Sequence, residues 1–304
     1  LTEHEAPPGV THAYRAGGSD IDLAVDMRSD ADRDRDAVAR LYGRIRTRTA
    51  ARGELLVPVE EATERAAFMG LWLDRLGLRA AQPHAVARLA PGAALLAHDR
   101  VPGTRLSERG ADLDVDEMAD AWRAIAALHT GHVAHGALDL DAVAIDGDGN
   151  AWLQRLQSAS LDAPDALLMT DRATFLVECT LAVGAEQAVA ACRAGLGDDG
   201  LRATLPYVQV PALPLRTRLR LRRNEKLVSA LRDEAGRAVG ADEVELVRLA
   251  RVKASTLLAL AGGLLALVVL LPQMTNLSDA AKAMANADWP WLLPVVVCVA
   301  LGYV

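Results

Sequence analysis

The stretch that decides the fold is residues 122–156, WRAIAALHTGHVAHGALDLDAVAIDGDGNAWLQRL. Its first part completes an amphipathic pattern that predicts a helix over Val115–His129, because apolar residues recur there every three or four positions. A short link then reaches the pair His135-Gly136, and a polar loop runs on to Val143. These residues predict a helix, a link and a loop, in that order.

A hairpin is predicted directly after the loop. Two short apolar runs, 143–145 and 151–153, flank the turn Asp-Gly-Asp-Gly-Asn. Gly and Asn tolerate the positive φ angles that a tight turn between antiparallel strands requires. We expect Asp146 and Asp148 to bond the local backbone of this turn, as aspartates in turns do, rather than to bind a metal.

The rest of the first 213 residues mixes strands and helices. Ile21–Met27 alternates apolar and polar residues as a strand does, and the apolar run Ala93–His98 predicts another strand. Val59–Leu76 has helical spacing, and the region beyond the hairpin is mostly helical. Strands and one helix followed by a helix-rich region predict an α+β fold with two lobes.

The order of helix, His-Gly loop and hairpin resembles the catalytic segment of the protein-kinase-like superfamily in its aminoglycoside-phosphotransferase-like form. That family carries H-G-D-x-x-x-x-N, a hairpin and an aspartate-containing metal motif. The resemblance covers roughly residues 11–195 and implies a hinge between the lobes over 94–106. It also implies that Glu64 stands at the place of the αC glutamate, and that Asp171 is the buried aspartate that holds the catalytic loop.

The residues that phosphoryl transfer requires are missing at the matching positions. Transfer needs a carboxylate to orient the attacking hydroxyl, and carboxylate and amide ligands for magnesium. After the His-Gly pair, Ala137 stands in place of the catalytic aspartate and Ala142 in place of the metal-binding asparagine. The metal-motif aspartate falls at Gln154 or Arg155, and a guanidinium there would repel a cation.

The lysine that clamps nucleotide phosphates is missing as well. The lysines of the chain all lie beyond the kinase-like region, at Lys226, Lys253 and Lys282. Where the family has Ala-Val-Lys in a strand, this sequence ends the same triplet with Asp26, which would repel a triphosphate. We therefore expect a pseudokinase, with no catalytic residue, no metal and no cofactor. Its retained scaffold residues are Glu64, His135, Gly136 and Asp171.

Two alternatives stay open. In the first, Asp139 or Asp141 serves as the base of a divergent phosphotransferase, with Asp146 or Asp148 binding the metal. A displacement of two or four residues moves a carboxylate several Å along the backbone, and phosphoryl transfer tolerates little misplacement. In the second, the domain is a purely structural module that organises a complex.

The C-terminal part is predicted to be embedded in a membrane. The 18 residues 254–271 carry no charge and are long enough to cross the hydrocarbon core as a helix, so we place a span at about 254–274. Residues 289–304 open with Trp-Pro-Trp and stay apolar, which predicts a second span. Because the chain begins at Leu1 and ends within this run, we interpret it as part of a longer protein.

The flanks of the first span predict its orientation. Arg248, Arg251 and Lys253 precede the span, whereas the loop after it carries one lysine. The positive-inside rule therefore places residues 1–253 in the cytoplasm, at the cell's inner (plasma) membrane.

A basic strip, PLRTRLRLRR, occupies residues 214–223. An anionic inner leaflet would attract such a strip, and a solvated charged linker would explain it equally well. The candidates for contact with the membrane surface are Arg216, Arg218, Arg220, Arg222 and Arg223. The domain before the strip is acidic, in a chain of net charge −7, which argues against nucleic acid as a partner.

The segment LLPQMTNLSDAAKAMANADW, at 270–289, resembles the opening of the lysylphosphatidylglycerol synthase transmembrane, or flippase-like, family. Actinobacterial members join a kinase-like cytoplasmic domain to such a membrane bundle, and the Arg-, Ala- and Asp-rich composition suits that source. The resemblance implies a multi-pass protein that handles lipid, and no aminoacyl-transferase domain is visible in the sequence.

The expected organisation has three parts. Residues 1–213 form the kinase-like domain, 214–253 a basic juxtamembrane linker with a helix, and 254–304 the start of the membrane domain. The expected function is a catalytically inactive regulatory or interaction domain tethered to a lipid-handling membrane bundle. Its expected partners are the bilayer with its anionic lipids and another protein that binds the kinase-like domain.

Overall fold

The computed structural model describes most of the chain up to residue 247. The described residues are 2–4, 12–18, 21–31, 33, 34, 37, 57–222, 224, 226–241 and 245–247. The chain divides into two units, 1–251 and 252–304, and every described residue belongs to the first. The two predicted spans therefore lie outside the described residues. Within the described part, no helix combines the length and the apolar character that crossing a membrane requires.

A five-stranded antiparallel sheet forms the first region of the fold, in the order β1-β2-β3-β5-β4. Its strands are β1 (Thr2–His4), β2 (His12–Gly18), β3 (Ile21–Ser29), β4 (Pro83–Ala90) and β5 (Ala93–Asp99). The strands predicted at Ile21–Met27 and Ala93–His98 are confirmed. They pair directly with each other, and Asp26 stands opposite Leu96.

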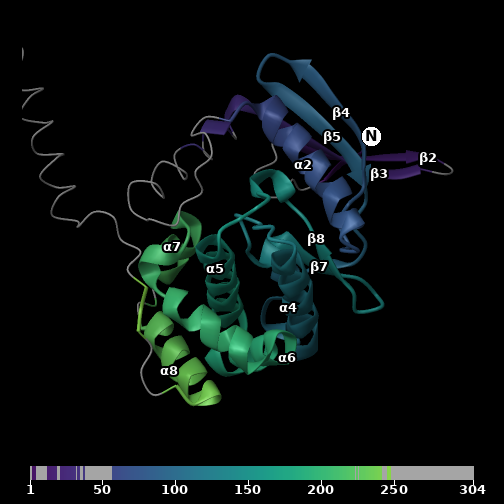
Figure 1. The fold of residues 1–304 in the computed structure, drawn as a ribbon. Coiled ribbons are helices and arrows are strands. Elements are labelled where there is room, and N and C mark those ends of the chain that lie inside the picture. The colour runs from purple at the N-terminus through teal and green to yellow at the C-terminus, as the bar shows by residue number, and fades with distance from the viewer. Residues whose placement is uncertain are drawn as a thin grey trace, which may run out of the picture. The chain divides into compact units, whose positions relative to one another are not determined.

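Helix α2 (Val59–Arg75) lies against β4 and β5 (Figure 1). Glu60 and Glu61 lie in its first turn, where negative charge is favourable because the helix dipole is positive at that end. Met69 and Leu73, on the inner face of this helix, are buried and belong to the main hydrophobic core. The helix predicted over Val59–Leu76 is confirmed.

A second, smaller sheet follows in the order β6-β7-β8, with β6 at Thr104–Arg105, β7 at Val143–Ile145 and β8 at Ala151–Leu153. The predicted hairpin 143–153 is confirmed to the residue. Gly103 precedes β6 with φ 87°, and a Cβ atom there would lie 1.9 Å from the carbonyl oxygen of Ile145. Only glycine fits this close approach, which joins the hinge segment to the hairpin.

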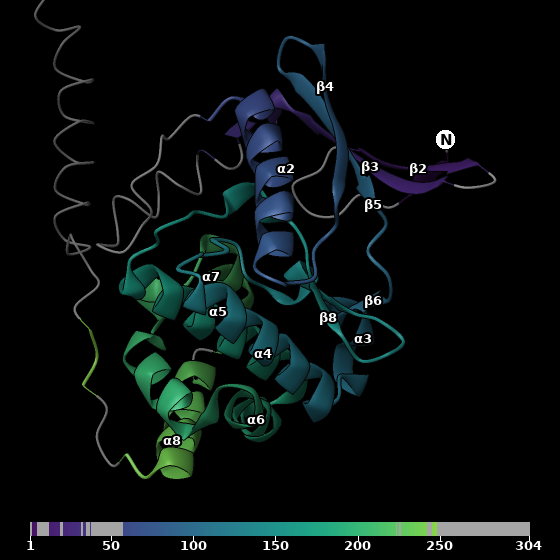
Figure 2. The same cartoon turned by 45° about the vertical axis from the view of Figure 1, so that its right-hand side comes forward.

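Helices form the remainder of the described chain and pack around one core (Figure 2). They are α3 (Leu106–Arg109), α4 (Val115–Thr130), α5 (Asp165–Val183), α6 (Ala185–Thr204), α7 (Leu215–Leu221) and α8 (Leu227–Val239). At the centre, the rings of Trp122 and Phe175 meet edge to face with their centroids 4.9 Å apart. The predicted helix Val115–His129 is confirmed as α4, which begins with a capping box between Asp114 and Glu117.

The predicted linker at 214–253 differs from what the structure shows. Leu221 of α7 is buried, and so are Val228, Leu231 and Ala235 of α8, and all four belong to the main core. Burial of these side chains makes both helices part of the helical region, because removing them would expose its apolar face to water. The mixed α+β class expected from the sequence is confirmed, whereas the helical region reaches well beyond residue 213.

Candidate functional site

The loop from His135 to Ala142, the central loop, connects the end of α4 to the hairpin. Gly136 adopts φ 75°, and a Cβ atom there would lie 2.4 Å from the carbonyl oxygen of Ser158. Just before it, Ala134 and Ser160 exchange two backbone hydrogen bonds of 3.0 and 2.9 Å. Glycine is therefore required where the loop turns against the segment that follows the hairpin.

Asp171 holds the first end of the central loop. Its carboxylate is buried on α5 and accepts hydrogen bonds from the backbone N–H groups of His135, at 2.6 Å, and Gly136, at 3.2 Å. His129 Nε2 lies 3.7 Å from the same carboxylate, while His129 Nδ1 accepts a hydrogen bond from Arg172. The resemblance implies this arrangement, in which a buried aspartate fixes the loop through backbone groups.

The two histidines beside Asp171 serve the scaffold. Burial lowers the pKa of His129 and of His135, although Asp171 opposes the shift in both. The His135 ring is fully buried; its Nε2 lies 2.7 Å from the carbonyl oxygen of Gln154, and its Nδ1 accepts a 3.4 Å bond from Ala137 N–H. A neutral ring that uses both nitrogens on backbone groups is a structural element.

The two alanines stand where the resemblance places catalytic side chains. Ala137 follows Gly136 directly and is partly exposed, and Ala142 is fully buried at the start of the hairpin. The Ala142 backbone accepts a 2.9 Å bond from Gln154 N–H. A methyl group can neither accept a proton nor bind a metal, so neither position supplies chemistry for phosphoryl transfer.

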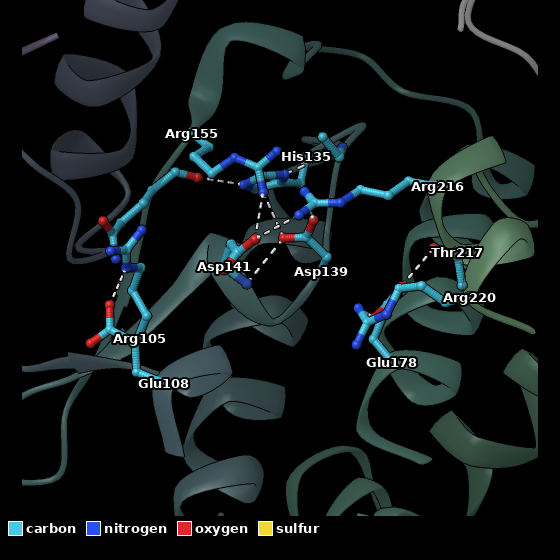
Figure 3. Close-up of polar contacts among 12 residues, drawn as sticks. Arg105, Glu108, His135, Asp139, Asp141, Arg155, Glu178, Arg216, Thr217 and Arg220 are labelled. Carbon is cyan, nitrogen blue, oxygen red and sulfur yellow. Dashed lines mark hydrogen bonds and ion pairs between the residues drawn. The ribbon is translucent and has the colours of Figure 1, made fainter. Parts of the chain in front are cut away.

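Two arginines bind the carboxylates of Asp139 and Asp141, at the second end of the central loop (Figure 3). Arg155 Nη1 donates a 2.7 Å hydrogen bond to Asp139 Oδ1 and lies 4.0 Å from Asp141 Oδ2. Arg216 reaches over from α7, with one nitrogen 3.4 Å from Asp139 Oδ2 and another 3.4 Å from Asp141 Oδ2. The four side chains form a closed ionic cluster of two negative and two positive charges, which we call the Asp-Arg cluster.

The members of the Asp-Arg cluster differ in exposure. Arg155 is 12% exposed, Asp139 16% and Asp141 18%, whereas Arg216 is 54% exposed. Arg155 follows the hairpin with a left-handed backbone, φ 61° and ψ 47°, and its side chain points at the central loop. Its guanidinium thus places a positive charge beside the two carboxylates, at one of the two positions, Gln154 or Arg155, where the resemblance puts an aspartate of the metal motif.

The cluster leaves little room for a metal or a base. Both oxygens of Asp139 accept hydrogen bonds. Oδ1 accepts from Arg155 and from the backbone N–H of Asp141, the latter at 3.1 Å, and Oδ2 accepts from Arg216. A carboxylate engaged by guanidinium donors is not free to take a proton from a hydroxyl. In the described part of the chain, no group of three or more histidine, cysteine, aspartate or glutamate side chains is arranged to hold a metal ion.

Of the two hairpin aspartates, Asp146 behaves as the turn chemistry predicts. Asp146 accepts hydrogen bonds from the backbone N–H groups of Asp148 and Asn150 and from the side chains of Asn150 and Trp152. The bond from Trp152, followed by those from Asn150 and Asp148, lowers the pKa of Asp146 to about 2 despite some desolvation. Asp148 is exposed. Asp146 is therefore committed to the turn.

Glu64 and Asp26 do not meet at the site. Glu64 is exposed on α2, and its side chain makes no hydrogen bond or ion pair with the described residues. Asp26 lies 3.4 Å from Nε2 of His98 on the neighbouring strand. Burial alone would lower the pKa of His98, but the hydrogen bond and the charge of Asp26 outweigh it and raise that pKa.

A second buried carboxylate was not predicted from the sequence. Glu178, in the apolar middle of α5, is 1% exposed and accepts a 2.7 Å bond from Thr217 Oγ1 and an ion-pair bond from Arg220, both on α7. Burial raises the pKa of Glu178, although Thr217 and Arg220 oppose the shift. A lone glutamate among apolar residues was the available signal, because a buried charge needs a partner.

Some arginines of the basic strip therefore bond to other residues of the fold, and Arg222 faces the solvent. Arg216 and Arg220 reach the carboxylates just described, and Arg218 donates a 2.7 Å bond to the carbonyl oxygen of Leu213. Arg222 is exposed, and the side chain of Arg223 lies outside the described residues. Part of the strip thus fastens α7 to the central loop and to α5.

A pocket of about 270 Å³ opens beside the Asp-Arg cluster. It is lined by Ser107, Gly110, Ala111, Asp139, Leu140, Asp141, Leu181, Ala182 and Arg220. Both signs of charge therefore meet at this pocket, which lies between α3, the central loop, the end of α5 and α7.

The solved structures similar to this chain include a viral protein kinase, titled "Structure of the Cydia pomonella Granulovirus kinase, PK-1". It shares 13% sequence identity with this chain at a TM-score of 0.35, and the match covers 53% of this chain. The chain spans about half the length of that kinase, 51%. No protein-family model and no curated protein matches the sequence. At this identity, the function has to come from the contacts of this chain's own residues.

Proposed function

We propose that residues 1–251 form a catalytically inactive, kinase-like domain that regulates or binds a partner while tethered to a membrane. One observation carries the proposal. The position after the His-Gly pair is Ala137, and the two carboxylates within the central loop, Asp139 and Asp141, are bound by Arg155 and Arg216. On this proposal the site lacks a free base, and Arg155 and Arg216 supply the positive charge beside its carboxylates.

The retained scaffold supports the kinase-like part of the proposal. A sheet with one helix precedes a helical region, and within that region the central loop and the hairpin follow each other between α4 and α5. Asp171 binds the backbone of His135 and Gly136, which fixes the loop whatever its side chains are. A kinase-like scaffold that lacks the residues for phosphoryl transfer is consistent with a domain that acts by binding a partner or by changing its conformation.

The sequence supports the membrane part. The apolar runs 254–271 and 289–304 are long enough to enter a bilayer, and basic residues precede the first. On this proposal the chain is a multi-pass protein of the inner membrane, similar to the flippase-like family, and its membrane part handles lipid. Anionic lipids and a protein that binds the kinase-like domain are its proposed partners, and no nucleic acid or cofactor takes part.

The alternative is a divergent phosphotransferase with Asp139 or Asp141 as its base. The pocket beside these residues favours it, because a substrate hydroxyl could approach both carboxylates there. Catalysis would require Arg155 and Arg216 to leave the carboxylates first, since each now donates to them.

Nucleotide binding separates the two functions. Purified full-length chain in detergent would be titrated with ATP, with and without magnesium, and followed by thermal shift and calorimetry. A bound nucleotide stabilises the folded state by RT ln(1 + [L]/Kd), so an inactive domain shows no shift at millimolar ATP. Stabilisation that depends on magnesium and disappears in Asp139→Asn or Asp141→Asn, but not in Asp165→Asn on the exposed start of α5, would support the enzyme instead.

The extent of a soluble fragment follows from the structure. Residues 1–213 alone would lose α7 and α8, which bury Leu221, Val228 and Leu231 in the core. A fragment for calorimetry should therefore extend to residue 251. Resistance of the full-length chain to extraction from membranes by alkaline carbonate tests the membrane tether separately, and ready extraction would contradict it.

A further inference from the structure

The outward face of α7 carries a basic and apolar pattern. Arg216 and Leu219 of α7 and Arg222, which directly follows the helix with helical backbone angles, are spaced three residues apart, which places them on one side. Arg216 is 54% exposed and Leu219 is 52% exposed, and Arg222 is exposed as well. No acidic side chain lies within α7. An exposed leucine between arginines is the pattern of a surface that rests on charged headgroups with an apolar anchor.

Two contacts of α7 differ in how tightly they hold their arginines. Arg220 is bound to Glu178, a buried carboxylate that also takes the hydroxyl of Thr217. Arg216 is held more loosely, because its two bonds are 3.4 Å long and half of its side chain faces water. Arg220 thus fastens α7 to α5, while Arg216 can exchange its partner without moving the helix.

Helices α7 and α8 come shortly before the first predicted span in the sequence. Helix α8 ends at Val239, and the first predicted span begins at 254. Fifteen intervening steps of backbone reach at most about 50 Å, which is an upper limit on the distance between the end of α8 and the start of the first predicted span. The cytoplasmic leaflet carries negative charge and attracts arginines within a Debye length.

We propose that the face of α7 formed by Arg216, Leu219 and Arg222 docks on anionic phospholipid headgroups, and that Arg216 then exchanges Asp139 and Asp141 for a lipid phosphate. The inference rests on the proposed membrane tether and adds its regulation. Docking weakens the Asp-Arg cluster from one side, because Arg155 alone remains on the two carboxylates. The charge of the bilayer is thereby communicated to the central loop.

The test uses the full-length chain in nanodiscs, with Cys298→Ser and Leu219→Cys introduced. The other two cysteines, Cys179 and Cys192, are buried, and burial raises the pKa of both thiols, so they react slowly. The rate of labelling by a water-soluble maleimide is compared in phosphatidylcholine discs and in discs rich in phosphatidylglycerol. We expect labelling at 219 to slow about tenfold in the anionic discs.

Three controls define the cause of any protection. Leu89→Cys on β4, which is 48% exposed, should react at the same rate in both discs. Arg216→Ala combined with Arg222→Ala should abolish the protection at 219. Inorganic phosphate added to neutral discs should give no protection, whereas protection by phosphate would assign the face to a free anion and overturn the proposal.

Hydrogen exchange tests the communication with the central loop. In anionic discs the amides of residues 139–142 should exchange faster than in neutral discs, because Arg216 has left the cluster. Equal labelling at 219 in the two discs overturns docking, and protection without faster exchange overturns the partner change. A chain that fails to remain in the discs overturns the membrane tether as well, so the two failures are distinguishable.

Discussion

At the His135 end of the central loop a buried carboxylate binds backbone amides, whereas at the Asp139–Asp141 end two carboxylates bind arginine side chains. Asp171 serves groups that every residue except proline carries, so its role survives changes in the loop's own side chains. The second end depends on Arg155 and Arg216, which come from different parts of the chain. The fold of the loop and its chemistry are therefore supported independently, and one can be lost while the other remains.

The largest effect is expected at the backbone-bound end. Asp171→Asn removes a buried charge that accepts from His135 and Gly136, and should lower the free energy of unfolding by about 3 kcal/mol. Chemical denaturation followed by tryptophan fluorescence measures the change. Asp165→Asn, an exposed site at the start of the same helix, should stay within about 0.5 kcal/mol. If Asp171→Asn and Asp165→Asn lowered the free energy of unfolding equally, the backbone-bound end of the central loop would have no special role in stability.

The second prediction separates the two arginines of the Asp-Arg cluster. Arg155→Ala should cost about 2 kcal/mol, because it leaves two nearly buried carboxylates with one loosely held arginine. Arg216→Ala should cost less than about 1 kcal/mol, because that pair is half exposed and its bonds are long. Denaturation of both variants at one pH measures the difference. A cost for Arg216→Ala that equals the cost for Arg155→Ala would show that α7 is essential to the cluster.

The third prediction extends the comparison to Glu178, whose pKa is raised by burial. The folded state then holds this proton more tightly than the unfolded state, so stability falls as pH rises from the ordinary value of 4.5 through the raised folded pKa. Arg220→Ala removes the opposing charge and should deepen that fall by about 1 kcal/mol, a figure reduced for solvent screening. Glu178→Gln should make the profile flatter, and unfolding measured at several pH values shows whether it does.

The smallest effect concerns a carboxylate bound to neutral donors only. The pKa of Asp146 is held at about 2, against an ordinary value of 3.8, so its contribution is complete above 3.8 and is lost as pH falls through 2. Asp146→Ala should cost about 1 kcal/mol at neutral pH and less in acid. Asp148→Ala in the same exposed turn should change little. If the free energy of unfolding changes with acid pH in the same way for both variants, the assignment of Asp146 as the carboxylate bound in the turn is contradicted.

Much of the fold was predictable because it depends on short-range patterns. The hairpin 143–153 follows from turn residues between two apolar runs, and α4 follows from its spacing of apolar residues. The packing of α7 and α8 into the core was not predicted, because the arginines of 214–223 dominate that stretch while Leu221 and Val228 supply the buried contacts. From the sequence alone, an alternating basic strip is interpreted as a linker, because the burial of its leucines depends on tertiary packing.

The site was predictable to a similar depth. Ala137 and Ala142 are visible in the sequence as side chains that cannot perform phosphoryl transfer, and Asp146 is visible as a turn residue. The pairing of Glu178 with Arg220 and of Asp139 with Arg216 joins residues far apart in the chain. Periodicity and motif spacing carry no information about such pairs, since they depend on how complete helices pack.

The sequence by itself determined the α+β class, the hairpin, the alanines at 137 and 142 and the apolar runs that predict a membrane anchor, because each depends on residue type and local spacing. Only the tertiary structure decided which carboxylates are anchored to the backbone and which are neutralised by arginines. It also decided that α7 belongs to the folded domain rather than to a linker. These are contacts between distant segments, and their geometry exists only once the core has brought α5, α7 and the central loop together.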